Sequence, residues 1–212
     1  MDMFTTVLAG LPLTLLVTAA ALGGGSILAI PLTLGLRRRV GPIWLSCRLI
    51  VDLCRGIPQL VWIFLIYYGV TIGDFQFSAL GAGILALSIV ASGYLAEIFR
   101  GALKSVHAGQ FEGAAALGLS PLSTWLLIVA PQATRIAIPG YTNYAIALLK
   151  DSAIVSIIGV AEIALRTGQL ARSSDTGIYV YVIAAAIYIA ISIPLGILSR
   201  SFDTRLRAAA TR

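Results

Sequence analysis

The chain has 212 residues, of which 58% are hydrophobic and only 11% charged, and its mean hydropathy is +0.94. Soluble domains usually carry about 25% charged residues, so this composition excludes an ordinary soluble protein and predicts a single-domain integral membrane protein. The net charge of +6 does not indicate nucleic-acid binding, because most basic residues lie between or just beyond apolar runs.

Long uncharged runs in the chain predict membrane-spanning helices, each long enough to cross about 30 Å of hydrocarbon. Residues 113–134 are also uncharged, but Pro121 and Pro131 divide them, so we expect an interfacial segment there. The fourth predicted span is interrupted by Lys150 and Asp151. The expected fold is therefore an all-α membrane protein of five spans, at about 10–36, 56–73, 76–100, 134–163 and 177–199.

The distribution of basic residues predicts the orientation of these five spans. With the N-terminus outside, the outer segments hold only Arg166 and Arg172. Twelve basic residues against two is the bias expected for inner loops, so we expect the N-terminus outside and the C-terminus inside. The inner residues are Arg37, Arg38, Arg39, Arg48, Arg55, Arg100, Lys104, Arg135, Arg200, Arg205, Arg207 and Arg212.

The loop between the third and fourth spans, at about 105–131, predicts a short cytoplasmic helix. There is room for about two helical turns between Gly109 and Gly118, and Gly118 can take the left-handed conformation that ends a helix. Glu112 is expected near the helix start, where a carboxylate suits the dipole. Ser120-Pro121 then predicts a new helix start. From these residues alone, a docking helix and an ordinary amphipathic connector remain equally open.

The same loop resembles the cytoplasmic signature loop of bacterial ABC-importer permeases, in which Glu-Ala-Ala is followed by Gly and then by Ile and Pro at fixed spacing. Glu112, Gly113 and Ala114, then Gly118, Ile128 and Pro131, occupy those positions. Gly113 replaces the usual Ala and Ala130 the usual Leu, and the former weakens the helix by roughly 1 kcal/mol.

Further segments resemble the polar amino acid branch of these permeases, the histidine, glutamine and arginine type. They are Arg55-Gly56-Ile57-Pro58-Gln59-Leu60, Tyr94-Leu95-Ala96-Glu97-Ile98-Phe99-Arg100-Gly101 and Leu149-Lys150-Asp151-Ser152. With the loop, the resemblance extends over about residues 10 to 205 in the right order.

The resemblance implies a permease subunit that pairs with an identical or homologous permease, two ATPase subunits and a periplasmic or lipid-anchored binding protein for a polar amino acid. The chain has no Walker A pattern, so the resemblance implies that ATP and Mg bind to the partner ATPase and that this chain is neither an enzyme nor a cofactor protein. The residues expected to couple to the ATPase are Gly109, Glu112, Gly113, Ala114, Ala115, Ala116, Leu117 and Gly118.

Polar residues within the spans are candidates for the substrate path, because charges in the membrane are costly. The candidates are Asn143, Lys150, Asp151, Ser152 and Ser156. For Lys150 and Asp151 a structural role is the favoured alternative. Glu97 and Arg100, three residues apart, are interpreted first as an ion pair and second as part of a gate. The run Gly23-Gly24-Gly25 permits either close packing or a bend.

Two other functions stay open from the sequence. A stand-alone secondary transporter would normally show more spans or an inverted repeat, and a membrane enzyme would need a cluster of catalytic side chains. An ABC importer for an opine or another amino-acid derivative is the nearer alternative. The expected location is the bacterial inner membrane, and neither the amino acid nor the identity of the second permease is predicted.

Overall fold

The computed structural model describes residues 2–37, 40–72, 75–173 and 177–210, with side chains up to Ile197 in the last range. Helices dominate, as the sequence predicts, and one antiparallel pair of two-residue strands joins Thr71 to Gln76 and Ile72 to Phe75. The elements are α1 (Met3–Leu8), α2 (Leu11–Leu36), α3 (Pro42–Gly56), α4 (Gln59–Gly69), β1 (Thr71–Ile72), β2 (Phe75–Gln76), α5 (Ala79–Lys104), α6 (Ala108–Ala116), α7 (Pro121–Thr124), α8 (Ala130–Asp151), α9 (Ile163–Arg172) and α10 (Gly177–Ala210).

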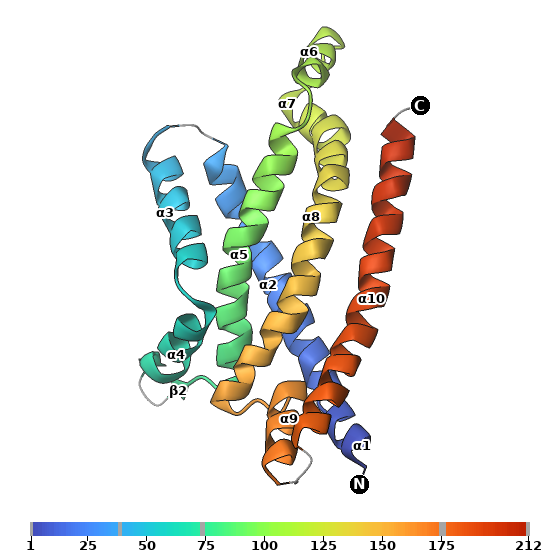
Figure 1. Ribbon diagram of the computed structural model, residues 1–212. Helices are drawn as coiled ribbons and strands as arrows, with labels where there is room; N and C mark the ends of the chain where they lie inside the picture. Colours follow the sequence, from blue (N-terminus) through green and yellow to red (C-terminus); the bar gives the residue numbers. More distant parts are fainter. Residues whose placement is uncertain (1, 38–39, 73–74, 174–176, 211–212) are drawn as a thin grey trace.

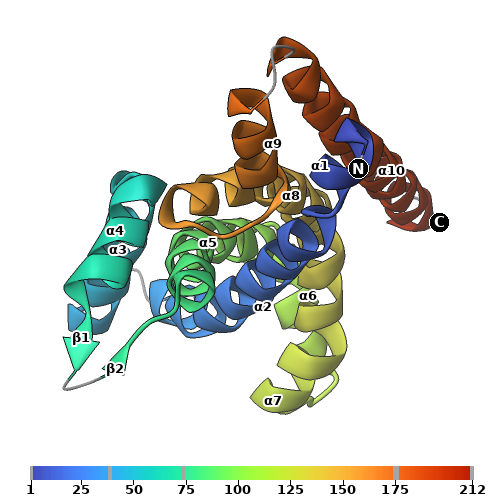
Figure 2. The same ribbon diagram turned by 90° about the horizontal axis from the view of Figure 1, so that it is seen from below.

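Helix α5 lies at the centre of the bundle, with α2, α3, α4 and α8 packed around it and α10 at the edge (Figures 1 and 2). Its buried face is rich in small residues, which lets α2 approach closely. A Cβ atom added at Gly25 would lie 2.5 Å from the Cβ of Ala91, and one added at Gly24 would lie 2.6 Å from the Oγ of Ser88. The glycine run of α2 therefore serves close packing.

The predicted second span, 56–73, is not a single helix. The helix α4 has only 11 residues, about 16 Å, and α3 precedes it at an angle of 99°. The chain turns at Ile57, which is extended because Pro58 disfavours the helical conformation in the residue before it. The sequence does not predict α3 as part of a span because the helix carries Arg48, Asp52 and Arg55. Residue 73, the end of the predicted span, lies outside the described residues.

The helix in the region of the predicted fourth span, 134–163, begins and ends closer to the N-terminus than predicted. Helix α7 continues through a π-helical turn, Trp125–Val129, directly into α8, so Pro131 lies in the first turn of α8 and does not break the chain. At the other end α8 stops at Asp151, and a 3-10 helix, Ser152–Ile158, follows and ends at Gly159 with φ of 90°. Residues 113–134 are thus largely helical and partly continuous with α8.

The long helices α2, α5, α8 and α10 run back and forth along roughly one direction, and the two termini lie at opposite ends of the molecule (Figure 1). By length and composition, three helical stretches among the described residues are apolar enough to cross a membrane, Met3–Leu36, Ala79–Lys104 and Gly177–Ile197, and the bent pair of α3 and α4 adds a fourth if it is counted as one span. Of the basic residues used to predict orientation, Arg38, Arg39 and Arg212 lie outside the described residues.

Candidate functional site

Helix α6 is a short helix with defined ends. At its start, the Nδ1 of His107 accepts a hydrogen bond of 3.1 Å from the backbone N–H of Gly109. At its end, Gly118 has φ of +67°, and the N–H groups of Gly118 and Leu119 donate to the carbonyls of Ala115 and Ala114. This pattern is a Schellman motif, which fixes where the helix stops.

The helix α6 protrudes beyond the other helices at one end of the molecule (Figure 1). Ala114 is buried, whereas Ala115, Ala116 and Leu117 are exposed, Leu117 by 78%. A hydrogen bond of 2.9 Å from Gln132 Nε2 to Gln110 Oε1 ties the helix to α8. The result is a braced helix that presents small and apolar side chains to its surroundings.

The position of Glu112 differs from the prediction. Because His107 starts the helix at Ala108, Glu112 is its fifth residue, beyond the first turn where the dipole acts most strongly. Its side chain is exposed, and so are its neighbours Phe111 and Gly113. The sequence predicted this helix between Gly109 and Gly118, whereas in the structure it begins at Ala108 with His107 as its cap.

The base of the α6 segment is held by a small apolar cluster. Val106, Val129 and Ala133 are buried together, with Leu103 and Trp125 packed against them. This cluster joins the end of α5 to the π-helical turn and α8. A movement of α6 is therefore connected to both helices rather than absorbed by a loose loop.

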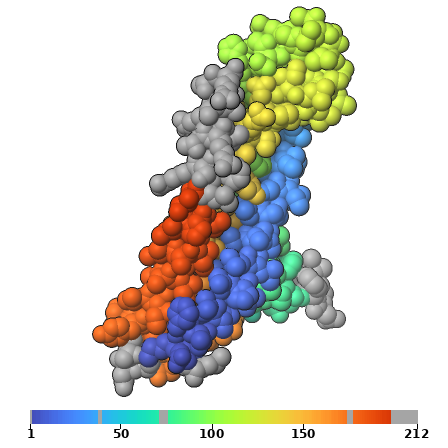
Figure 3. Space-filling view, turned by 90° about the vertical axis from the view of Figure 1, so that its right-hand side faces the viewer, coloured from blue at the N-terminus to red at the C-terminus, as the bar shows by residue number. Residues whose placement is uncertain are grey.

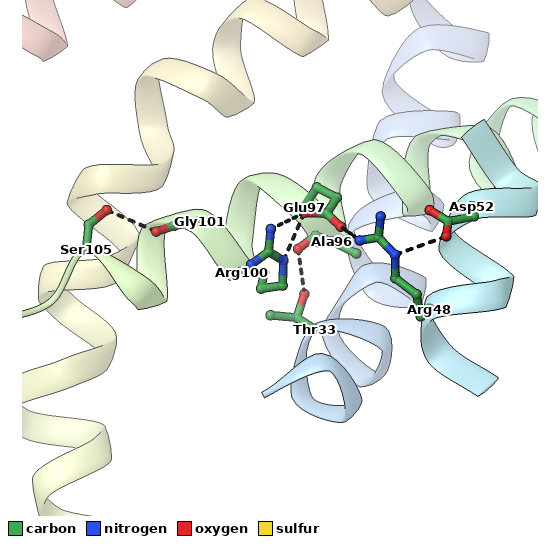
Figure 4. Close-up of polar contacts among 8 residues, drawn as sticks. All are labelled: Thr33, Arg48, Asp52, Ala96, Glu97, Arg100, Gly101 and Ser105. Atoms are coloured by element: carbon green, nitrogen blue, oxygen red, sulfur yellow. Dashed lines mark hydrogen bonds and ion pairs between the residues drawn. The ribbon is translucent and has the colours of Figure 1, made fainter. Parts of the chain in front are cut away.

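A network of four charged side chains links α3 to α5 (Figure 4). Arg100 contacts Oε2 of Glu97 at 2.6 Å, and Arg48 contacts Oε1 of Glu97 at 2.8 Å. Arg48 also pairs with Asp52 at 3.0 Å. The Glu97 side chain is 17% exposed and shares both its oxygens, so it is the centre of the network. The spacing of Glu97 and Arg100 predicted their ion pair, but nothing in the sequence indicated that Arg48 would join it.

The substrate-path candidates do not form one cluster. Asp151 Oδ2 accepts a hydrogen bond of 2.8 Å from Gln59 Nε2 at the start of α4, while Lys150 and Asn143 are exposed. Ser152 is buried, and its Oγ donates to the backbone carbonyl of Leu149, so its hydrogen bond stabilises the C-terminal end of α8. Ser156 is half-buried on the following 3-10 helix. Asp151 is thus the candidate that joins two elements.

Aromatic residues extend from this region along α5 and α8. The rings of Tyr94 and Tyr144 are stacked at 5.3 Å, and the Arg55 guanidinium lies 5.2 Å from the Tyr94 ring. One turn or more further along, Phe99 stacks on Tyr141 at 6.3 Å. These residues were not predicted as a group, because their juxtaposition depends on how α5 and α8 pack.

The whole chain is similar to solved transporter subunits. It matches the structure titled "Crystal structure of an amino acid ABC transporter with histidines" with a TM-score of 0.86 and 32% identity, covering 95% of this chain and 94% of that one. A subunit of the MetNI methionine ABC transporter in an inward-facing conformation has the same fold, with a TM-score of 0.79 at 18% identity. The fold is therefore that of the membrane-spanning subunit of an ABC transporter.

Sequence comparison shows the family. Residues 21–208 match the family described as "Binding-protein-dependent transport system inner membrane component", and the chain belongs to it. The arginine ABC transporter permease protein ArtQ of Haemophilus influenzae is 38% identical over 68% of each chain. The octopine transport system permease protein OccM of Rhizobium radiobacter is 35% identical over 88% of this chain and 80% of its own. The chain is thus an ABC-importer permease, a transport component rather than an enzyme.

Proposed function

We propose that this chain forms half of the translocation pathway of an ATP-driven importer for polar amino acids and couples to its ATPase through α6. The observation that supports this most is the protruding, braced helix with Ala115, Ala116 and Leu117 exposed. Small side chains let another protein's surface approach closely, and the fixed ends of α6 allow a push from that surface to reach α5 and α8.

The proposed topology has five spans, with the N-terminus outside and the C-terminus inside. They are α2, the bent pair of α3 and α4, α5, α8 and α10. The two termini lie at opposite ends of the molecule, which supports an odd number of spans (Figure 1). Helix α8 has 22 residues, about 33 Å, which suffices for a crossing although its composition is more polar. Arg48 and Arg55 lie on α3, so the inner residues fall from twelve to ten, against two outside, which still supports this orientation.

The proposed assembly contains a second permease, identical or homologous, two ATPase subunits and a periplasmic or lipid-anchored binding protein, all in the bacterial inner membrane. The family's description as an inner membrane component of binding-protein-dependent systems supports this. ATP and Mg would bind only to the ATPase. Glu97 and Arg100 lie towards the α6 end of α5, where breaking and remaking their network could accompany opening of an inner gate.

The substrate we propose is a polar amino acid or a close derivative such as an opine. Relatives named for arginine and for octopine support this class, since both compounds carry an ammonium or guanidinium group and a carboxylate. Asp151 supplies a carboxylate beside Gln59 at the junction of α4 and α8, where a cationic group could be met. Asn143 and Ser156 remain path candidates.

Co-purification tests the coupling proposal. The tagged chain is purified from native membranes in mild detergent, and its stoichiometric partners are identified by mass spectrometry. Ala115→Asp adds a charge to the exposed face of α6, and Gln169→Glu adds the same charge to the exposed side of α9 at the other end. We expect an ATPase to accompany the native chain and Gln169→Glu but not Ala115→Asp. An ATPase that accompanies all three, or none, would overturn the assignment of α6.

A further inference from the structure

Two cavities border each other at the end of the molecule where α2 and α5 end. The first, of about 570 Å³, lies between α2, α3 and α5 and is lined by four basic residues, Arg37, Arg48, Arg100 and Lys104. The second, of about 620 Å³, lies between α2, α5 and α8 and is lined mostly by apolar side chains. We call them the basic pocket and the apolar groove.

The basic pocket carries an excess of positive charge. Arg48 and Arg100 share Glu97, and Arg48 also meets Asp52. Arg37 and Lys104 are exposed and pair with no carboxylate in the part of the chain that the structure describes. Four cations against two carboxylates leave a site that favours an anion, and guanidinium groups suit phosphate in particular.

The apolar groove is one leaflet deep. On α2 its lining begins at Ser26, whose Oγ lies 3.2 Å from the hydroxyl of Tyr141 on α8, and this polar contact closes its inner end. Ile30 and Leu34 line it further out and are about half exposed, by 54% and 47%. From Ser26 to Leu34, the last residue of α2 that lines the groove, the helix rises about 12 Å, a little under half of the roughly 30 Å hydrocarbon core. Figure 3 shows α2 lying along the surface of the bundle.

The two cavities meet. Leu103 lines both, and the guanidinium of Arg37, in the basic pocket, lies 4.3 Å over the ring of Trp125, which lines the groove. A ligand that fills both needs an anionic head and an apolar tail of about leaflet depth. A second copy of this chain would bring its own excess of positive charge, +6 overall, to the same place.

We propose that the basic pocket and the apolar groove form one binding site for an anionic phospholipid. The headgroup phosphate lies among Arg37, Arg48, Arg100 and Lys104, and one acyl chain lies along the groove between α2 and α8. Basic pockets between membrane helices are suited to lipid headgroups in this way. Because α5 carries part of both cavities, the bound lipid contacts the helix at the centre of the bundle. The site is independent of which solute is transported.

Quenching of tryptophan fluorescence by brominated lipids tests the proposal on the full chain in detergent, because Trp125 lines the groove. The chain is titrated with phosphatidylglycerol brominated on its acyl chains and, for comparison, with brominated phosphatidylcholine. We expect half-maximal quenching at an about tenfold lower mole fraction of phosphatidylglycerol. The double variant Arg37→Gln/Lys104→Gln removes this preference, whereas Arg135→Gln, an exposed cation that lines neither cavity, keeps it.

A groove variant and a free anion complete the test. Thr134→Phe fills the groove from its exposed side and should weaken quenching by both lipids, with a monodisperse elution peak as the check on folding. An unchanged lipid preference in the double variant would overturn the proposal. So would displacement by inorganic phosphate at equal concentration, which would indicate a free-anion site. Loss of self-association in Thr134→Phe with unaltered quenching would instead assign the groove to a contact between copies.

Discussion

The Nη1 of Arg48 lies 2.8 Å from Oε1 of Glu97, and this contact joins α3 to the central helix α5. Glu97 meets Arg100 through its other oxygen, so one carboxylate serves two helices. Arg48 also pairs with Asp52, whereas no other carboxylate among the described residues pairs with both Arg48 and Arg100. The two ends of this contact should therefore differ in how much they contribute to stability.

Removing the carboxylate should cost more than removing one guanidinium. Glu97→Gln leaves Arg48 and Arg100 facing each other and should lower the free energy of unfolding by roughly 2 kcal/mol. Arg48→Gln should cost no more than about 1 kcal/mol, because Arg48 is 39% exposed and its pairs are screened by water. Thermal unfolding in detergent measures both, and equal midpoints for the two variants would contradict the central role of Glu97.

The contact between α2 and α5 predicts opposite effects for neighbouring glycines. Gly25→Ala brings a Cβ to 2.5 Å from Ala91 and should destabilise the chain by roughly 1–3 kcal/mol. A Cβ atom added by Gly23→Ala would have no neighbour within 4 Å, so this change should be neutral or should stabilise α2 by up to about 1 kcal/mol. The unfolding midpoint in detergent distinguishes them. A drop of similar size for Gly23→Ala would mean that helix flexibility, not packing, is what the glycine run provides.

Gly113 and Gly118, two of the three glycines in residues 108–119, should likewise respond in opposite directions. Gly118→Ala forces a left-handed conformation on a side-chain-bearing residue and should loosen the end of α6 by roughly 1 kcal/mol. Gly113 lies inside the helix with open space around it, so Gly113→Ala should stabilise α6 by a similar amount. Amide hydrogen exchange over residues 108–119 checks this, with faster exchange expected in the first variant and slower in the second.

Asp151 should affect transport more than its neighbour Lys150. Asp151→Asn keeps a hydrogen-bond acceptor for Gln59 but removes the charge proposed to meet a cationic substrate group. We expect the half-saturating amino-acid concentration for uptake to rise about tenfold, the size of one charged contact of 1.4 kcal/mol. Lys150→Gln, an exposed neighbour, serves as the control and should change it little. A larger effect at Lys150 would remove Asp151 from the path.

Local signals in the sequence located the C-terminal end of α6 and the start of α7. Gly118 has the left-handed conformation that a helix-ending glycine supplies, and Ser120 accepts from the N–H of Ser123 beside Pro121, as a cap should. Such features depend on a few adjacent residues, so they can be predicted without knowing the tertiary structure. The docking role of α6 stays a prediction.

Features that depend on packing could not be predicted in the same way. The charged residues of α3 kept it from being predicted as part of a span. Its Arg48 pairs with Glu97, a residue 49 positions away in the sequence. The continuity of α7 with α8 was missed because Pro131 was interpreted as a break, although the π-helical turn at Trp125–Val129 carries the helix directly into the first turn of α8, where Pro131 lies. The contact of Gln59 with Asp151 likewise exists only once α4 meets the end of α8.

Uptake into proteoliposomes tests whether this chain works in an ATP-driven importer. The tagged chain is reconstituted with its co-purified partners and the binding protein, and uptake of labelled arginine, histidine and glutamine is followed with ATP on the ATPase side. We predict uptake that requires hydrolysable ATP and the binding protein and is lost in Ala115→Asp. Uptake driven by an ion gradient without ATP would contradict the claim and favour a secondary transporter.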